Sequence, residues 1–306
     1  MLKRTTLIAG LVLSAIGFSN AQAKALNHTG NLFVSDYGVG SITEITPNGT
    51  KSTFASGLNN PRGLAFDSSG NLFVSETYDG SIAEITPNGT KSTFASGLNS
   101  SYGLAFDSSG NLFVSDYGSI TEITPNGTKS TFASGLSSPY GGLAFDSSGN
   151  LFVSETYDGS IDEITPNGTK STFASGLSYP VGLAFDSSGN LFVSESGVGS
   201  ITEITPNGTK STFASGLSSY PNALAFDSSG KLFVSDYGAG SITEITPNGT
   251  KSTFASGLGY PFGLAFDGQT AGTNVPFEFS PEQGFMLGIP LFLGLRHLKK
   301  RRNKPS

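Results

Sequence analysis

Six acidic residues recur at equivalent positions along the chain and could together bind a cation. Each follows the motif LFVS, at a spacing of about forty residues, and they are Asp36, Glu76, Asp116, Glu155, Glu195 and Asp236. Oxygen ligands suit a hard cation such as calcium, so a ring of these carboxylates predicts a site for calcium or another divalent cation. The alternative is a solvated rim of acids that each cap their own loop, because exposed carboxylates are the norm.

A second set of residues has the types found in binding surfaces. Arginine and aromatic side chains are favoured in binding hot spots, and the variable segments before each LAFD motif contain Arg62, Tyr102, Tyr140, Tyr179, Tyr220, Tyr260 and Phe262. We predict that ligand contact uses Arg62, Tyr102, Tyr140 and Phe262, assisted by the six carboxylates. The rings could instead cover seams between sheets, since tyrosine often covers half-buried sheet surface. No catalytic residue is assigned, because residues inside the motifs recur in every repeat.

These candidate residues lie in an internal repeat. The unit restarts at Asn31, Asn71, Asn111, Asn150, Asn190 and Lys231, in steps of 40, 40, 39, 40 and 41 residues. A period near forty is typical of arrays whose units bury their apolar faces only against neighbours.

One repeat predicts four short strands. The expected strands of the second copy are Leu64–Phe66, Asn71–Ser75, Ser81–Thr86 and Lys91–Ser96, because each is rich in residues that suit a sheet. Gly70 and the run PNG between them are turn signals, which makes Asp67 and its equivalents turn residues. No part of the array has apolar residues at helical spacing, so the fold is expected to be all-β.

The strand count predicts how the array closes. The chain enters the array at NLFVS and leaves it with LAFD at 264–267, so the last strand would complete the first sheet. The prediction is an all-β, six-bladed β-propeller of four-stranded antiparallel blades, in which closure removes exposed strand edges. A β-solenoid is the structural alternative.

The two faces of such a propeller would differ. Successive loops of an antiparallel blade alternate between the faces, so the DSSGN and TPNGT turns share one face, which we call the repeated face. The loops after LFVS and before LAFD share the other, which we call the variable face. Almost all differences between the repeats lie in these second loops, so the variable face is the predicted functional surface.

The ends of the chain are different in composition. Residues 1–23 contain Lys3 and Arg4, an apolar run and an Ala-Gln-Ala ending, which predicts a signal peptide. The domains that follow are a propeller at 24–268, a linker at 269–274 and a C-terminal sorting or membrane segment at 275–306. That segment reads PFEFSPEQ, then an apolar stretch at 284–295, then six basic residues. The apolar stretch is short for a membrane span, which needs roughly 20 residues.

The composition favours an exported protein that does not bind nucleic acid. Cysteine is absent, so no disulfide or thiol chemistry is expected. Residues 24–274 contain nine basic and 21 acidic residues, a net charge of −12. Phosphate binding requires a positive surface, so nucleic acid is excluded as a partner.

Two resemblances add expectations. The run GLAFDSSGNLFVSETYDGSIAEITPNG at 63–89 resembles the NHL repeat and the blades of gluconolactonase/regucalcin-type lactonases and of streptogramin lyase, over roughly residues 30–268. The lactonase resemblance implies a divalent cation held on the axis by unlike ligands, and the lyase resemblance implies a catalytic histidine inside a blade. The only histidines are His28 and His297, outside the array. The C-terminus resembles the bacterial PEP-CTERM class of sorting signals, which implies processing by an exosortase-type enzyme after transient membrane association; a retained, positive-inside tail is the alternative.

The expected function is therefore that of an exported module in the periplasm, on the cell surface or secreted. It would act as a monomeric binding or scaffold propeller for a protein or carbohydrate ligand through its variable face. The alternative is a metal-dependent, lactonase-like hydrolase with a cation on the axis. Unlike carboxylate and amide ligands converging on the axis would favour the hydrolase, and a sixfold ring of like residues favours binding or structure.

Overall fold

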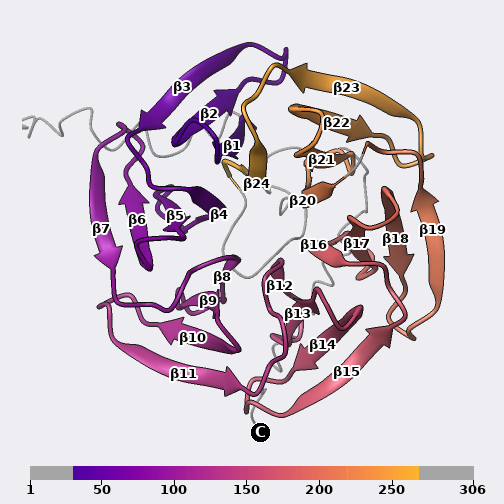
Figure 1. The fold of residues 1–306 in the computed structure, drawn as a ribbon, viewed down its shortest axis with the longest axis horizontal. Coiled ribbons are helices and arrows are strands. Elements are labelled where there is room, and N and C mark those ends of the chain that lie inside the picture. Colours follow the sequence, from indigo (N-terminus) through magenta and orange to yellow (C-terminus); the bar gives the residue numbers. More distant parts are fainter. Residues whose placement is uncertain (1–29, 219, 269–306) are drawn as a thin grey trace, which may run out of the picture. The chain divides into compact units, whose positions relative to one another are not determined.

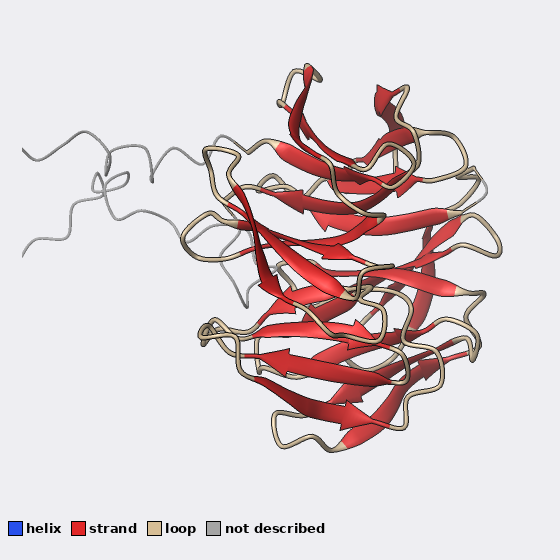
Figure 2. Ribbon diagram, turned by 60° about the vertical axis from the view of Figure 1, so that its left-hand side comes forward, coloured by secondary structure: helices blue, strands red, loops and turns tan. Residues whose placement is uncertain are grey.

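The repeat unit folds into four antiparallel strands, in the order in which the sequence predicts them. A computed structural model describes residues 30–218 and 220–268, and 24 strands form six four-stranded sheets in this part of the chain. The sheets are arranged as blades around a central axis (Figure 1), and Figure 2 shows strands joined by loops with no helix among the described residues. The fold is a six-bladed β-propeller, as predicted.

Each blade has an inner, a second, a third and an outer strand. The inner strands are β4 (Pro61–Phe66), β8 (Leu104–Phe106), β12 (Leu143–Phe145), β16 (Pro180–Phe185), β20 (Pro221–Phe226) and β24 (Pro261–Phe266). The second strands are β1 (Leu32–Asp36), β5 (Leu72–Glu76), β9 (Leu112–Asp116), β13 (Leu151–Glu155), β17 (Leu191–Glu195) and β21 (Leu232–Asp236). The third strands are β2 (Ser41–Ile45), β6 (Ser81–Ile85), β10 (Ser119–Ile123), β14 (Ser160–Ile164), β18 (Ser200–Ile204) and β22 (Ser241–Ile245). The outer strands are β3 (Lys51–Ser56), β7 (Lys91–Ala95), β11 (Lys129–Ser134), β15 (Lys170–Ser175), β19 (Lys210–Ala214) and β23 (Lys251–Ser256).

The last strand closes the ring by joining the first blade. The sheet order β24-β1-β2-β3 places the end of the array beside its beginning (Figure 1), with Leu32 opposite Phe266 and Val34 opposite Leu264. The closure predicted from the strand count is confirmed, and the solenoid alternative is wrong. Each blade then has its inner strand at the axis, protected by the neighbouring blades, and its outer strand as the edge at the periphery.

The core lies between neighbouring blades. The second strands are buried along their whole length, and each hydrophobic cluster draws residues from two adjacent blades. Phe33 shows the packing, because its ring meets Phe54 of its own blade at 4.9 Å and Phe66 of the next blade at 5.0 Å, both edge to face. The same arrangement recurs around the ring, so the six seams between blades are nearly equivalent.

The turns of the repeated face have the predicted chemistry. Asp67 Oδ1 accepts hydrogen bonds from the backbone N–H groups of Ser69 and Asn71, at 2.9 and 2.8 Å. Gly70 has a φ of +82°, which glycine adopts at little steric cost. Asp67 and its equivalents are therefore structural turn residues.

Several predictions from the chain ends lie outside the described residues. These are the signal peptide, the linker and the C-terminal segment. Within the described ranges, there is no helix with the length and apolar character needed to cross a membrane.

Candidate binding site at the axial mouth

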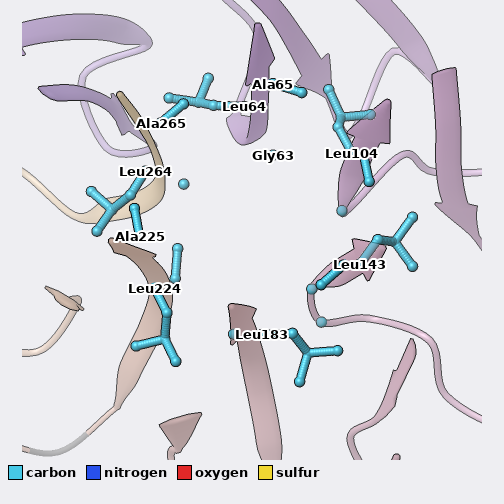
Figure 3. Close-up of a pocket in the computed structure, with 18 of the residues that line it drawn as sticks. Gly63, Leu64, Ala65, Leu104, Leu143, Leu183, Leu224, Ala225, Leu264 and Ala265 are labelled. Carbon is cyan, nitrogen blue, oxygen red and sulfur yellow. The ribbon is translucent and has the colours of Figure 1, made fainter. Parts of the chain in front are cut away.

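An apolar cavity follows the propeller axis. Its volume is about 170 Å³, and its lining, taken from the described residues, consists only of glycine, alanine, valine, leucine, phenylalanine and tyrosine. Figure 3 shows leucine side chains from all six inner strands around the cavity. They are Leu64, Leu104, Leu143, Leu183, Leu224 and Leu264.

The mouth of this cavity on the variable face carries different residues in different blades. They lie just before the LAF motifs, at the start of an inner strand or in the loop that leads into it: Arg62, Tyr102, Tyr140, Val181, Asn222 and Phe262. Tyr102, Tyr140, Val181 and Phe262 line the cavity. The structure thus brings the four predicted arginine and aromatic residues together at the axis. Sequence reasoning missed Val181 and Asn222, although their position before LAF could have revealed them.

Arg62 lies among three aromatic rings. Its guanidinium carbon is 5.2 Å from the ring centre of Tyr37, 5.1 Å from that of Tyr102 and 4.9 Å from that of Phe262. Contacts of this kind stabilise a cation electrostatically. No aspartate or glutamate in the described ranges forms an ion pair with Arg62, and its buried Nε atom has no hydrogen-bond partner there.

Tyrosines extend the aromatic surface away from Arg62. The ring of Tyr140 lies 5.1 Å from Tyr102, 5.8 Å from Tyr117 and 5.6 Å from Tyr157. A hydrogen bond with Tyr117, together with burial, raises the pKa of Tyr140 to about 12. The Tyr140 hydroxyl is neutral at physiological pH, and because the bond that raises its pKa uses its proton towards Tyr117, its oxygen remains an acceptor for a ligand.

The loops after the second strands supply aromatic residues that sequence reasoning did not select. Tyr37 contacts Arg62, and its hydroxyl is 3.2 Å from that of Tyr78. The hydrogen bond to Tyr78, with help from Arg62, lowers the pKa of Tyr37, and the same bond raises the pKa of Tyr78. The recurring runs DYG and ETYDG were the available signal.

The remaining predicted aromatic residues lie apart from the cavity lining. Tyr179, Tyr220 and Tyr260 are each about half exposed, at 52, 58 and 48%. Tyr260 stacks on Tyr237 with ring centres 4.9 Å apart. They are surface residues of the variable face.

Buried serines hold the mouth in place. Ser75 is fully buried, and its Oγ donates to the carbonyl of Tyr102 in the next blade at 2.8 Å while accepting from the N–H of Gly63 at 2.8 Å. Ser35 Oγ donates in the same way to the carbonyl of Arg62, at 2.6 Å. Sequence reasoning missed these serines, which occupy the last position of LFVS.

Glycine lets the inner strands approach closely at this level. A Cβ atom on Gly63 would lie 2.3 Å from the carbonyl oxygen of Tyr102, closer than real contacts allow. The N–H of Gly63 donates to that same oxygen at 3.1 Å. Neighbouring blades therefore meet backbone to backbone around the axis.

The six acids of the carboxylate ring are buried and bind loops. The six side chains are buried, with 2–8% exposure, rather than solvated. Asp36 accepts from the N–H groups of Gly259 and Tyr260 at 2.7 and 3.0 Å, and Glu76 accepts from the N–H of Asn59 and from Lys91 at 2.9 Å each. Among the described residues, no three His, Cys, Asp or Glu side chains gather as a metal site would require. These contacts agree with the alternative in which each acid caps its own loop.

Glu155 differs from the other carboxylates in one oxygen. Its Oε2 accepts from the N–H groups of Ser137 and Ser138 at 3.0 and 2.5 Å, whereas Oε1 is buried with no hydrogen-bond partner in the described chain. Burial raises the pKa of Glu155, although the hydrogen bonds from Ser138 and Ser137 oppose this. A buried charge with an unpaired oxygen destabilises the folded state.

Comparisons with known proteins place the chain in a family. The model of the virginiamycin B lyase family matches residues 18–271. No curated protein sequence matches the chain. One similar structure is a catalytically inactive histidine-to-alanine variant of virginiamycin B lyase from Staphylococcus aureus with quinupristin, at 19% identity and a TM-score of 0.61, covering 80% of this chain and 91% of that one.

Two other structures share the fold. A chain of a nidogen/laminin complex has 21% identity and a TM-score of 0.69, with coverage of 76% of this chain and 97% of that one. A putative gluconolactonase has 20% identity and a TM-score of 0.57, covering 67% and 81%. These neighbours share the propeller fold. By the extent of the family match, the chain belongs to the virginiamycin B lyase family.

Proposed function

We propose that this propeller is a binding module that holds its ligand at the axial mouth of the variable face. The observation that carries the proposal is Arg62, a guanidinium with no acidic partner among the described residues, set within about 5 Å of three aromatic rings at the edge of an apolar cavity. Concave apolar sites with a few polar groups are where proteins bind ligands. Arginine and tyrosine supply much of the energy in such sites.

The residues present favour binding over lyase chemistry. In one relative, virginiamycin B lyase from Staphylococcus aureus, a histidine-to-alanine variant is catalytically inactive, and the lyase resemblance implies a histidine inside a blade. No histidine occurs between residues 29 and 296 of this chain. Family membership therefore supports the fold of this protein more than it supports the reaction.

The residues also give little support to a metal-dependent lactonase. Such an enzyme would need carboxylate or amide ligands converging on the axis, and the cavity lining drawn from the described residues has none. The acids near the mouth already accept hydrogen bonds from loop N–H groups.

The proposal includes an exported location. A signal peptide at 1–23 and a sorting segment at 275–306 would place the module in the periplasm, on the cell surface or in the medium, after processing by an exosortase-type enzyme. A protein or carbohydrate is the expected ligand there, because an acidic propeller disfavours polyanions.

Binding assays with matched variants test the proposal. Oligosaccharide and peptide arrays would be probed with the protein and with the double variant Tyr102→Ala/Phe262→Ala. Asn88→Ala, in an exposed turn of the repeated face, is the control. Ligands should be lost with the double variant and kept with the control. Ligands that depend on Asn88 and not on Tyr102 and Phe262 would overturn the proposal, as would calcium-dependent lactone hydrolysis that the double variant retains.

A further inference from the structure

We propose that the axial mouth binds a small organic acid, whose carboxylate pairs with Arg62 and whose compact apolar group enters the leucine-lined cavity. The inference rests on the proposed function of the mouth as a binding site, and it favours a small acid over the protein or carbohydrate expected from the exported location alone.

The first support is the isolation of Arg62. It is the only arginine between residues 24 and 274. The lysines of the outer strands bind backbone carbonyls at the periphery of the ring. Lys91 donates to the carbonyl of Gly57 at 3.0 Å, and Lys170 donates to that of Gly135 at 2.9 Å, in each case in the preceding blade. Arg62 is therefore the one cationic group placed at the axis by the described strands.

The second support is the unused donor of that guanidinium. The aromatic rings of Tyr37, Tyr102 and Phe262 attract its charge, and the hydroxyl of Tyr37 accepts a hydrogen bond from the guanidinium that helps to lower the pKa of Tyr37. The Nε atom is buried without a partner in the described chain. A buried donor of this kind requires an acceptor, and a carboxylate matches the guanidinium fork with two parallel hydrogen bonds.

The third support is the position of the cavity relative to Arg62. Two of the rings in contact with Arg62, those of Tyr102 and Phe262, also line the apolar cavity. A carboxylate held by Arg62 would therefore have its apolar substituent at the cavity entrance. Below the entrance, Leu64 and its equivalents present apolar side chains to the ligand (Figure 3).

The cavity volume sets the size of the apolar group. An engineered apolar cavity of about 150 Å³ stays dry and binds benzene, and the axial cavity measures about 170 Å³. A phenyl ring or a short alkyl group is therefore the matching occupant. Larger acids would leave part of their apolar surface outside.

Charge distinguishes this ligand from two other classes. Residues 24–274 have a net charge of −12, which repels a polyanion. A single carboxylate loses little affinity to this repulsion, because salt screens charges that lie more than about 8 Å away. A neutral sugar could stack on the tyrosines, but it would leave Arg62 without a counter-charge. The combination of one cation and one apolar cavity fits a monoanionic acid.

The test uses phenylacetate and two matched probes. Phenylacetamide has the same shape without the charge, and acetate has the charge without the ring. Isothermal titration of the full chain should show phenylacetate binding at least about tenfold more tightly than either probe, since each lost contact of about 1.4 kcal/mol is a factor of ten. Equal affinity for phenylacetate and phenylacetamide would overturn the proposal.

Three variants assign the contacts. Arg62→Met should weaken phenylacetate binding at least about tenfold and leave toluene binding unchanged, which also reports that the cavity is intact. Arg62→Lys should retain an intermediate affinity. Val181→Phe, which introduces the residue found at the corresponding position 262, should reduce binding of both phenylacetate and toluene by narrowing the mouth. Unchanged phenylacetate affinity in Arg62→Met would contradict the inference.

The outcomes separate this inference from the proposed function. Array ligands that depend on Tyr102 and Phe262, combined with no phenylacetate binding, would overturn the organic-acid inference and leave the binding module in place. Array ligands that do not depend on the mouth would overturn the proposed function itself. Asn88→Ala again serves as the control in both assays.

Discussion

At the scale of single residues, the six acids that follow the LFVS motifs have a different role from the one their regular spacing suggests. Six acids at equivalent positions predicted a cation site, but their oxygens accept hydrogen bonds from loop N–H groups. Sequence could not show this, because burial of Asp36 or Glu155 depends on the loop that folds over it. Arg62, Tyr102, Tyr140 and Phe262 were predictable, because variable loops beside invariant strands mark them.

We predict that Glu155→Gln stabilises the protein at pH 7. Burial raises the pKa of Glu155 above its ordinary value of 4.5, so the folded state binds the proton more tightly, and stability is lost as the pH rises from 4.5 through the folded-state pKa. Glutamine stays neutral and keeps an acceptor for the N–H groups of Ser137 and Ser138. We expect a gain of about 1 kcal/mol at pH 7, measured by urea unfolding, which shrinks as the pH falls towards 4.5.

The control for this change is Glu84→Gln, which removes one charge from a half-buried site on β6. The assigned cause would be contradicted if Glu155→Gln did not raise the stability at pH 7, or if its effect on stability grew as the pH fell. An equal gain in both variants would mean that net charge alone is responsible.

At the scale of elements, the strands were predictable and their ends were not. The inner strand expected at 64–66 begins at Pro61, because Pro61 pairs with Glu76 across a register shift in the ladder. The bulge arises where the loop before LAF is held by the carboxylate at the end of the second strand. In β8 and β12 the strand is the short one that the sequence predicts, and these are the two repeats with Ser101 and Tyr140 where the others have proline.

We predict that Ser75→Ala destabilises the seam between two blades. The change removes a hydrogen bond to the carbonyl of Tyr102 and one from the N–H of Gly63, both part-buried. Because the N–H of Gly63 still donates to the carbonyl of Tyr102, neither group is left unsatisfied, and we expect a loss of about 0.5–1.5 kcal/mol for each bond removed. For a chain of this size each kcal/mol lowers the melting temperature by about 2–4 °C. Thermal unfolding measures the effect, and Ser92→Ala on the exposed outer strand is the control. Equal melting temperatures would mean that the serine does not hold the seam.

At the scale of the whole molecule, near-identical repeats build a ring whose function depends on where they differ. The seams, turns and buried strands recur in each blade, and the residues that face the axial mouth do not. Sequence periodicity predicts such a ring well, because six strands of each kind admit one closed arrangement. Periodicity could not predict the axial cavity, because the size of the cavity depends on how closely the glycines let the inner strands approach one another.

Deleting residues 264–267 tests the closure. The change removes the part of β24 that pairs with Leu32, Phe33 and Val34, so the first blade loses its inner strand and exposes a free edge. We expect a lower melting temperature and self-association on gel filtration. A deletion variant as monomeric and as stable as the parent would contradict a ring that depends on this strand.

The fate of the basic tail tests the proposed export. If the segment at 275–306 is a sorting signal, processing removes the basic tail that includes Lys304, and the mature protein lacks it. Mass spectrometry of material purified from the native envelope should then find no peptides from the basic cluster. Recovery of such peptides from mature protein would show a retained anchor instead.

The glycine contacts around the axis also imply that ligand size is set by copy number. Each repeat contributes one inner strand to the cavity wall, and the strands already meet at backbone distance, as the contact of Gly63 with the carbonyl of Tyr102 shows. Substitution within a blade can therefore change the side chains that line the mouth, as in Val181→Phe, but can hardly alter the spacing of the strands around it. Gain or loss of one forty-residue unit by recombination between near-identical gene segments would change the width of the mouth in a single step. Selectivity for ligand size would then evolve by a change in the number of repeats. Selectivity for ligand charge would evolve by point mutation at positions such as Arg62.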